Sequence, residues 1–144
     1  MGNSLYGQDF HAWTVQQAEL LRERKFDCAD IDNIAEEIES MGRSERRELV
    51  SRLAERLTHL LKWRHQPASR GRPWRLTIEQ RRLHIEDHLA DNPSLKSQLD
   101  DAIRRGYRQA LIEAERETHL PRSTFPPRCP FTFDEAMDPD LWPD

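Results

Sequence analysis

Apolar residues recur every three or four positions through most of this 144-residue chain, a spacing that places them on one side of an α-helix. Hydrophobic residues make up 36% of the chain, charged residues 33%, and there are five glycines. This balance suits narrow amphipathic helices with solvated outer faces better than strands. A chain of this length buries one core comfortably, whereas two cores would each be marginal. We therefore predict an all-α fold and a single domain over residues 1–144.

Two helices are predicted in the first third of the chain. Asp9 is a typical N-cap for a helix that ends near Phe26. Asp30 caps the second helix, and Gly42 stands where a left-handed residue often ends one. The stripe of this second helix is the clearest in the sequence: Ile31, Ile34, Ile38 and Met41. We expect residues 1–8 to be a loose N-terminus.

Three further helices follow. One runs from Ser44 to Pro67 with two lines of apolar residues, and we expect it to be the central element. Residues 67–73 contain two prolines and a glycine, so they cannot be helical throughout, and a fourth helix is predicted from Trp74. Asn92 before Pro93 is a cap followed by a first-turn proline, which predicts the start of a fifth helix.

The C-terminal residues 121–144 are rich in proline and, from Asp134 onward, carry five acidic residues and no base. They also hold more large apolar residues than a solvated, disordered tail would: Phe125, Phe131, Phe133, Met137, Leu141 and Trp142. We expect this extension to pack on the helices. The predicted fold is a single-domain bundle of about five helices with a proline-rich C-terminal wrap.

The two cysteines, Cys28 and Cys129, are far apart and form no CxxC spacing, which indicates neither a zinc site nor a disulfide framework. The N-terminus has no charged leader followed by an apolar core, and no stretch approaches the roughly 18 apolar residues of a spanning helix. We expect a soluble cytoplasmic protein that does not bind membranes.

Four stretches of the sequence are similar to those of a known family. They are LYxQDFxAW over residues 5–13, EEIESMGRSERRELxSRL over 36–53, HLLKW over 59–63 and WRxTIxQRR over 74–82. With the proline-rich ending, the chain resembles over nearly its whole length the bacterial family catalogued as domain of unknown function number twenty-nine. The resemblance implies a small helical bacterial protein and supplies no activity, cofactor or catalytic residue.

The helix predicted from Ser44 to Pro67 has a second face. At 100° per residue, His59 and Trp63 point away from the leucine stripe, and Arg52 and Arg56 extend the same line. One interpretation is that another helix covers this face, for example the first helix through its aromatic residues. The other is a partner groove anchored by Trp63, since Trp and Arg are common interface anchors.

The segment from Lys62 to Arg82 carries seven basic residues and one acidic residue, a local charge of +6 in a chain of net charge -4. Trp63, Arg70, Arg72, Trp74 and Arg75 are residue types that bind phosphates and stack on bases. This pattern makes a nucleic-acid-associated protein an alternative function. The competing interpretation is internal pairing with the acidic stretch Asp27–Glu39 and the acidic tail.

Catalytic and metal-binding patterns have little support in the sequence. His84 and His88 are four residues apart, but neither HExxH nor HxxEH is present, and a metal-dependent enzyme is only a second alternative. The run of Glu36, Glu37 and Glu39 points in three directions. We predict no catalytic residue, no metal site and no cofactor.

The function that this sequence favours is a non-catalytic protein-interaction or adaptor domain with an unknown protein partner. The candidate binding surface comprises Arg52, Arg56, His59, Trp63, Arg70, Arg72, Trp74 and Arg75. A homodimer is a further prediction, because the fourth helix has two apolar faces and each requires a neighbour. Leu76, Leu83 and Ala90 lie on one face, and Ile78, Ile85 and Leu89 lie on the other.

Overall fold

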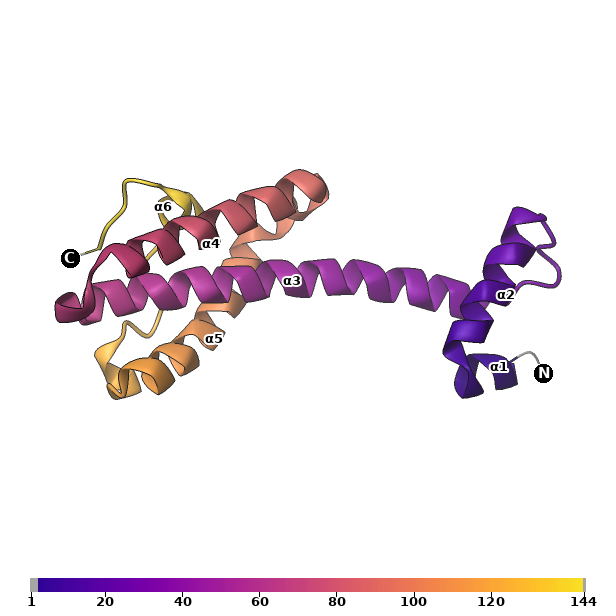
Figure 1. Ribbon diagram of the computed structural model, residues 1–144, viewed down its shortest axis with the longest axis horizontal. Helices are drawn as coiled ribbons and strands as arrows, with labels where there is room; N and C mark the ends of the chain where they lie inside the picture. The colour runs from indigo at the N-terminus through magenta and orange to yellow at the C-terminus, as the bar shows by residue number, and fades with distance from the viewer. Residues whose placement is uncertain (1–2, 144) are drawn as a thin grey trace. The chain divides into compact units, whose positions relative to one another are not determined.

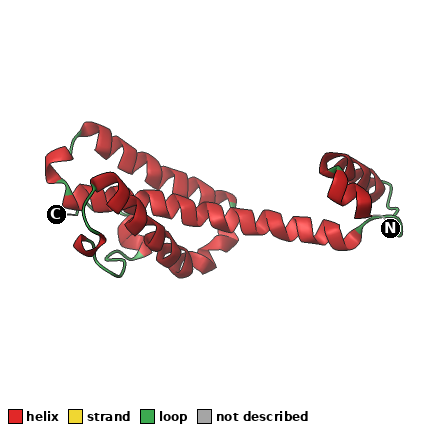
Figure 2. Cartoon of the chain, turned by 90° about the horizontal axis from the view of Figure 1, so that it is seen from below, coloured by secondary structure: helices red, strands yellow, loops and turns green. Residues whose placement is uncertain are grey.

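The computed structural model describes residues 3–143, and this part of the chain is helical with no strand (Figure 2). The four main helices are α2 (Phe10–Arg22), α3 (Ile31–His65), α4 (Arg72–Asp91) and α5 (Leu99–Thr118). The short ones are α1 (Asn3–Gln8), α6 (Phe133–Met137) and the 3-10 turns η1 (Pro67–Ser69), η2 (Pro93–Gln98) and η3 (Arg122–Thr124). The predicted all-α fold is confirmed, and no helix in the described part is long and apolar enough to cross a membrane.

The chain divides into two compact units, an N-terminal unit (Met1–Ser44) and a C-terminal unit (Glu45–Asp144). The boundary lies within α3, which contributes residues to both. The prediction of one domain over residues 1–144 stays a prediction.

The N-terminal unit is organised by polar bonds around two buried side chains. The Asp9 carboxylate accepts a hydrogen bond from the Ala12 amide at 3.0 Å, which confirms the predicted cap of α2. Trp13 is buried, and its indole nitrogen donates to the Asp30 carboxylate at 3.0 Å. The Asp30 amide donates to the side-chain oxygen of Gln17 at 2.7 Å. Among the described residues of this unit, only Trp13 and Gln17 are buried.

The prediction of a loose N-terminus over residues 1–8 was wrong for its described part, because α1 is helical. Tyr6 explains the order, since its ring contacts Trp13 with centroids 4.6 Å apart and Phe10 with centroids 5.8 Å apart. The Tyr6 hydroxyl also donates to the Glu37 carboxylate of α3. Residues 1 and 2 lie outside the described residues.

The predicted helix end at Gly42 was also wrong, because α3 runs without interruption from Ile31 to His65. A glycine ends a helix where its backbone adopts positive φ, and no described glycine does so. The residues after Gly42 are good helix formers, so continuing the backbone hydrogen bonds outweighs the cost of about 1 kcal/mol for one glycine in a helix interior. The two helices predicted before and after Gly42 are one helix.

The C-terminal unit is a three-helix core (Figure 1). In it α4 runs antiparallel to α3, while α5 runs parallel to α3. Gly106 sets the distance between α3 and α5, because a Cβ built on it would meet the Val50 carbonyl oxygen and the Ala54 amide at 3.2 Å. The core is contributed by all three helices and the C-terminal extension: Leu49, Val50, Leu53, Leu57, Leu60, Leu61, Ile78, Ile85, Leu89, Leu95, Ala102, Ile103, Tyr107, Ala110, Ala114, Phe125, Phe131 and Ala136.

The connections around α4 largely follow the prolines. Residues 67–73 are not one helix, as predicted: η1 ends at Ser69, and α4 begins at Arg72 after an extended Gly71. The fifth helix was predicted from Pro93, but residues 93–98 form η2 and α5 begins at Leu99. On α4, one predicted face is buried through Ile78, Ile85 and Leu89, and the other leaves Leu76 and Leu83 exposed. The homodimer stays a prediction.

The proline-rich C-terminal wrap is confirmed. Phe125 and Phe131 are buried in the core, as is Ala136 of α6. The Tyr107 hydroxyl of α5 donates to the Pro126 carbonyl oxygen at 2.6 Å. A capping box between Thr132 and Glu135 starts α6, with both bonds at 3.1 Å. The extension is therefore held by apolar burial as well as by hydrogen bonds.

Candidate functional site

Arg56 was predicted on the candidate binding surface, and the structure corrects this placement. The side chain is 1% exposed. Its guanidinium donates to the Ala136 carbonyl oxygen at 2.7 Å and to the Ile78 carbonyl oxygen at 2.6 Å. Burial lowers the pKa of Arg56 to about 10, with nearby Arg82 acting in the same direction. Arg56 thus ties α3 to α4 and α6 instead of facing a partner.

Trp63 is half-buried, and the residues that cover it come from the C-terminal extension and from the α3–α4 connection. The Trp142 ring lies 4.8 Å from the Trp63 ring between centroids. The Arg70 guanidinium lies 5.4 Å from the centroid of Trp63, and its Nε donates to the Trp63 carbonyl oxygen at 2.6 Å. A second Arg70 nitrogen donates to the Pro143 carbonyl oxygen at 3.2 Å. Arg70 therefore joins the end of α3 to Pro143.

Two other cations of this region, Lys62 and Arg75, also contact aromatic rings within the fold. Arg75 lies 5.3 Å from the Trp142 ring centroid, and Lys62 lies 4.9 Å from that of Trp74. Arg72 is exposed. These partners are aromatic rings, whereas the internal-pairing interpretation named the carboxylates of Asp27–Glu39 and of the acidic tail, so that interpretation and the nucleic-acid alternative both stay predictions.

The acidic partners of the basic segment are glutamates on the three long helices of the C-terminal unit. Three ion pairs have these distances: Lys62 to Glu117 at 3.3 Å, Arg81 to Glu55 at 3.0 Å and Arg82 to Glu86 at 2.9 Å. On the predicted surface, Arg52 pairs with Glu48 at 2.8 Å. Each pair is partly exposed, so each contributes about 1 kcal/mol or less to stability.

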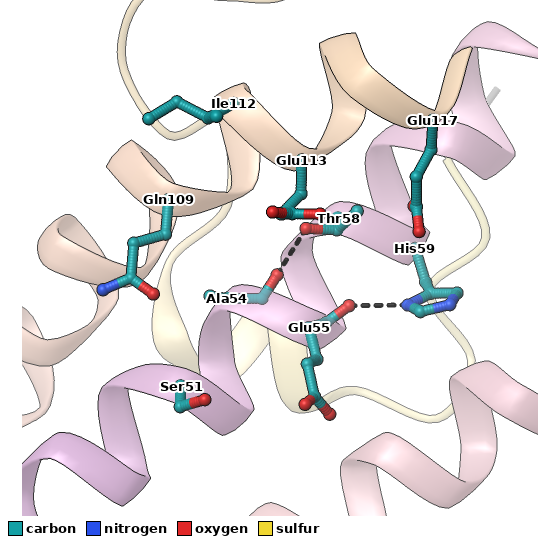
Figure 3. Close-up of a pocket in the computed structure, with 9 residues that line it drawn as sticks. All are labelled: Ser51, Ala54, Glu55, Thr58, His59, Gln109, Ile112, Glu113 and Glu117. Atoms are coloured by element: carbon teal, nitrogen blue, oxygen red, sulfur yellow. Dashed lines mark hydrogen bonds between the residues drawn. The ribbon is translucent and has the colours of Figure 1, made fainter.

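His59 lies beside an open groove between α3 and α5 (Figure 3). The groove has a volume of about 400 Å³ and is lined by Ser51, Ala54, Glu55, Thr58, His59, Gln109, Ile112, Glu113 and Glu117. His59 Nδ1 lies 2.7 Å from the Glu55 carbonyl oxygen, which can only accept, so Nδ1 carries the proton. Burial lowers the pKa of His59, although this hydrogen bond acts in the opposite direction.

The groove is acidic at its rim and has little reactive chemistry. Figure 3 shows the carboxylates of Glu113 and Glu117 pointing from α5 toward α3. The Thr58 hydroxyl donates to the Ala54 carbonyl oxygen at 2.7 Å, so its proton is directed at the backbone. The three carboxylates at the rim are already paired within the C-terminal unit, Glu117 with Lys62, Glu55 with Arg81 and Glu113 with Arg116. Sequence reasoning missed the groove, although the small residues Gly106, Ala110 and Ala114 signal a close approach of α5 to another helix.

The histidines at positions 84 and 88 do not form a shared metal site with a third ligand. His88 Nε2 lies 2.9 Å from the Glu45 carbonyl oxygen and 3.7 Å from the Glu45 carboxylate, so this ring faces α3. His84 is half-buried. Within residues 3–143, no group of three or more His, Cys, Asp or Glu side chains is arranged to hold a metal ion. Both cysteines are free thiols.

The most exposed apolar surface lies on the N-terminal unit, along the stripe that made the second predicted helix so clear. Ile31, Ile38 and Met41 are 50%, 62% and 67% exposed, and we call these three residues the N-terminal apolar face. At 100° per residue, they fall within an arc of about 80°. Ile34, which lies inside this arc between Ile38 and Met41, is half-buried.

Comparison with known proteins identifies the family. The model of the family described as a domain of unknown function, DUF29, matches residues 5–142. This chain belongs to the DUF29 family. No curated protein and no solved structure matches it.

The match covers nearly the whole DUF29 chain, so every candidate surface described above lies within the family domain. Of the residues predicted to form the binding surface, the structure brings Trp63 and Arg70 into contact and places Arg75 against Trp142, which also covers Trp63. Arg56 lies in the core instead. The N-terminal apolar face was recognised in the sequence as a helix stripe but not as a surface.

Proposed function

We propose that this DUF29 chain is a cytoplasmic, non-catalytic protein-interaction or adaptor domain, and that its partner binds the N-terminal apolar face. One observation carries the proposal: six of the nine large hydrophobic residues that are exposed in the described chain lie in the N-terminal unit. The six are Phe10, Val15, Phe26, Ile31, Ile38 and Met41. The unit thus exposes far more apolar side chains than it buries.

The free energy of burying these side chains is large enough to support an interface. Complete removal of one Ile or Met side chain from water contributes about 1.5 to 3 kcal/mol. Three such residues on one helix face resemble the apolar centre of a protein interface, which a polar rim surrounds. Contiguous exposed apolar patches on soluble domains mark interaction sites.

The test is quantitative affinity capture from the organism that encodes the protein, with chemical cross-linking before lysis. Three baits are compared: the wild type, the double variant Ile38→Ser/Met41→Ser, and Leu83→Ser as a matched control. Leu83 is 48% exposed on α4 in the other unit. The proposal expects a set of proteins that the wild type and Leu83→Ser recover and the double variant loses.

The same proteins recovered with all three baits would contradict the proposal. Circular dichroism and urea unfolding of each bait show whether the double variant keeps its fold. Serine at exposed helix positions costs about 0.5 kcal/mol each in helix propensity, so we expect the fold to survive.

A further inference from the structure

The shape of the N-terminal apolar face matches a helix. Ile31, Ile34, Ile38 and Met41 repeat at intervals of three, four and three residues, the a and d spacing of a helix seam. The stripe is about 15 Å long on a helix that rises 1.5 Å per residue. A narrow stripe of this kind is the complement of another amphipathic helix, whose apolar residues recur with the same spacing.

The charge of the N-terminal unit indicates the charge of the helix that would bind it. Asp27–Glu39 contains six acidic residues and no basic residue, and the N-terminal unit has nine acidic and four basic residues, a net charge of -5. Asp32, Glu36 and Glu39 are exposed. A binding segment with the same sign of charge would be repelled, while a basic one would be attracted.

The acidic residues of the N-terminal unit differ in how far they are already engaged. The Asp30 carboxylate accepts from Asn33 at 2.8 Å and from Trp13 at 3.0 Å, and Glu37 accepts from Tyr6. Arg43 lies 3.1 Å from Glu36 and 3.9 Å from Glu39.

Asp32 makes no ion pair with any residue in the described part of the chain. The Asp32 carboxylate therefore remains open to an external cation, while the exposed carboxylates of Glu36 and Glu39 share the cation Arg43. A partner that binds the N-terminal unit therefore encounters a net negative charge.

We propose, resting on the proposed function, that the segment that binds the N-terminal apolar face is an amphipathic helix whose apolar stripe is flanked by Lys and Arg. Its apolar residues cover Ile31, Ile38 and Met41. Its basic side chains lie along that surface with their aliphatic stems and extend toward Asp32 and Glu39, which lie about 80 to 100° from Ile31 around the helix, whereas Glu36 lies on the side opposite the stripe. A second copy of this chain fits less well, because its N-terminal unit carries the same net charge of -5.

The test measures binding of defined peptide probes to the full-length chain by fluorescence anisotropy. The first probe is a helical peptide of about 21 residues, three heptads, with Leu at the a and d positions and Lys or Arg beside them. The second has Glu in place of each Lys and Arg. The third has the composition of the first, reordered so that the leucines share no face.

We expect the first probe to bind at least about tenfold more tightly than either of the others, because it alone combines the apolar stripe with positive charge. Ile38→Ser/Met41→Ser should weaken its binding by about tenfold or more, and Leu83→Ser should leave it unchanged. Asp32→Asn/Glu39→Gln should weaken binding at about 0.05 M salt. Raising the salt to about 0.5 M should then weaken the binding of this variant less than that of the wild type, because fewer charges remain to be screened.

Three results would overturn the inference: no binding of the first probe, equal binding of the acidic probe, or binding that Ile38→Ser/Met41→Ser does not change. Light scattering of the unbound chain gives a further result that would overturn it, namely a dimer that the same double variant dissociates. If affinity capture depends on Ile38 and Met41 while the peptide test fails, the proposed interaction role stands. Only the inference that the partner segment is a basic amphipathic helix is then contradicted.

Discussion

The two units of the chain use the same sequence pattern with opposite results. In the C-terminal unit, the stripe of α3 through Leu53 and Leu57 is fully buried, because α4 and α5 pack along it. In the N-terminal unit, the stripe through Ile38 and Met41 is more than half exposed. Apolar residues spaced three or four positions apart thus predict that a helix forms. They do not indicate whether the rest of the same chain covers that helix.

The difference in burial also suggests that the two units have different roles, one in stability and one in binding. The C-terminal unit has a continuous core of its own, so its stability does not require a partner. The N-terminal unit is held by directed contacts, such as the bond from Trp13 to Asp30, and leaves apolar area for another molecule. We infer that the C-terminal unit is the structural support and that the N-terminal unit binds the partner.

The largest expected effect compares a buried residue with an exposed one on the same helix. Leu57→Ala should lower the free energy of unfolding by about 3 kcal/mol, because Leu57 is 0% exposed and its removal leaves a cavity. Ile38→Ala should change it by no more than about 0.5 kcal/mol. Urea unfolding measures both, and a cost of 2 kcal/mol or more for Ile38→Ala, roughly the cost of a core position, would show that Ile38 is covered in the isolated chain.

Arg56→Met should give the next largest loss, about 2 kcal/mol, because methionine fills the space but leaves the Ala136 and Ile78 carbonyl oxygens without their donor. Arg72→Met is the matched control, since Arg72 is exposed at the start of α4. Thermal unfolding of the two variants measures the difference. Equal stabilities would mean that Arg56 does not join α3 to α6 in solution.

Tyr107→Phe should cost about 1 kcal/mol at neutral pH, because it removes the hydrogen bond to Pro126. Burial raises the pKa of Tyr107 to about 12 from its usual 10.0. The folded state therefore holds this proton more tightly than the unfolded state, and stability is lost as the pH rises from 10 toward 12. Urea midpoints should fall more steeply over this range for the wild type than for Tyr107→Phe; parallel curves would exclude this role.

The smallest expected effect concerns the two glycines inside long helices. Gly42→Ala should raise helix stability by about 0.5 to 1 kcal/mol, because a Cβ there meets no atom of the described chain within 4 Å. Gly106→Ala should be destabilising, since the same Cβ meets two backbone atoms at 3.2 Å. Calorimetry measures the melting temperatures of both variants. A shift in the same direction for Gly42→Ala and Gly106→Ala would contradict the contrast between an open position in the N-terminal unit and a close helix contact in the C-terminal unit.

Local signals in the sequence predicted much of the fold. The cap at Asp9, the prolines between α3 and α4 and the aromatic residues of the C-terminal extension each have a local or compositional cause, and the structure confirms them. Gly42 was misread because a stop depends on the backbone angle that the glycine adopts, which the residue type alone does not fix.

The candidate site was harder to predict, because it depends on contacts between distant residues. Arg56 is buried only because carbonyl groups 22 and 80 residues away accept its protons. Trp63 is covered by Trp142, which no local pattern indicates. The exposure of Ile38 could not be read from its stripe either, since a buried and an uncovered stripe have the same period.

Site-specific photo-cross-linking in the encoding organism tests most directly whether the N-terminal apolar face binds a partner. A photoreactive phenylalanine analogue is placed at Ile38, at Met41 and, as a control, at Leu83, and cross-linked products are identified by mass spectrometry. We predict one shared protein partner that is cross-linked from positions 38 and 41 and absent from position 83. Cross-links from position 83 alone, or none from positions 38 and 41, would contradict it.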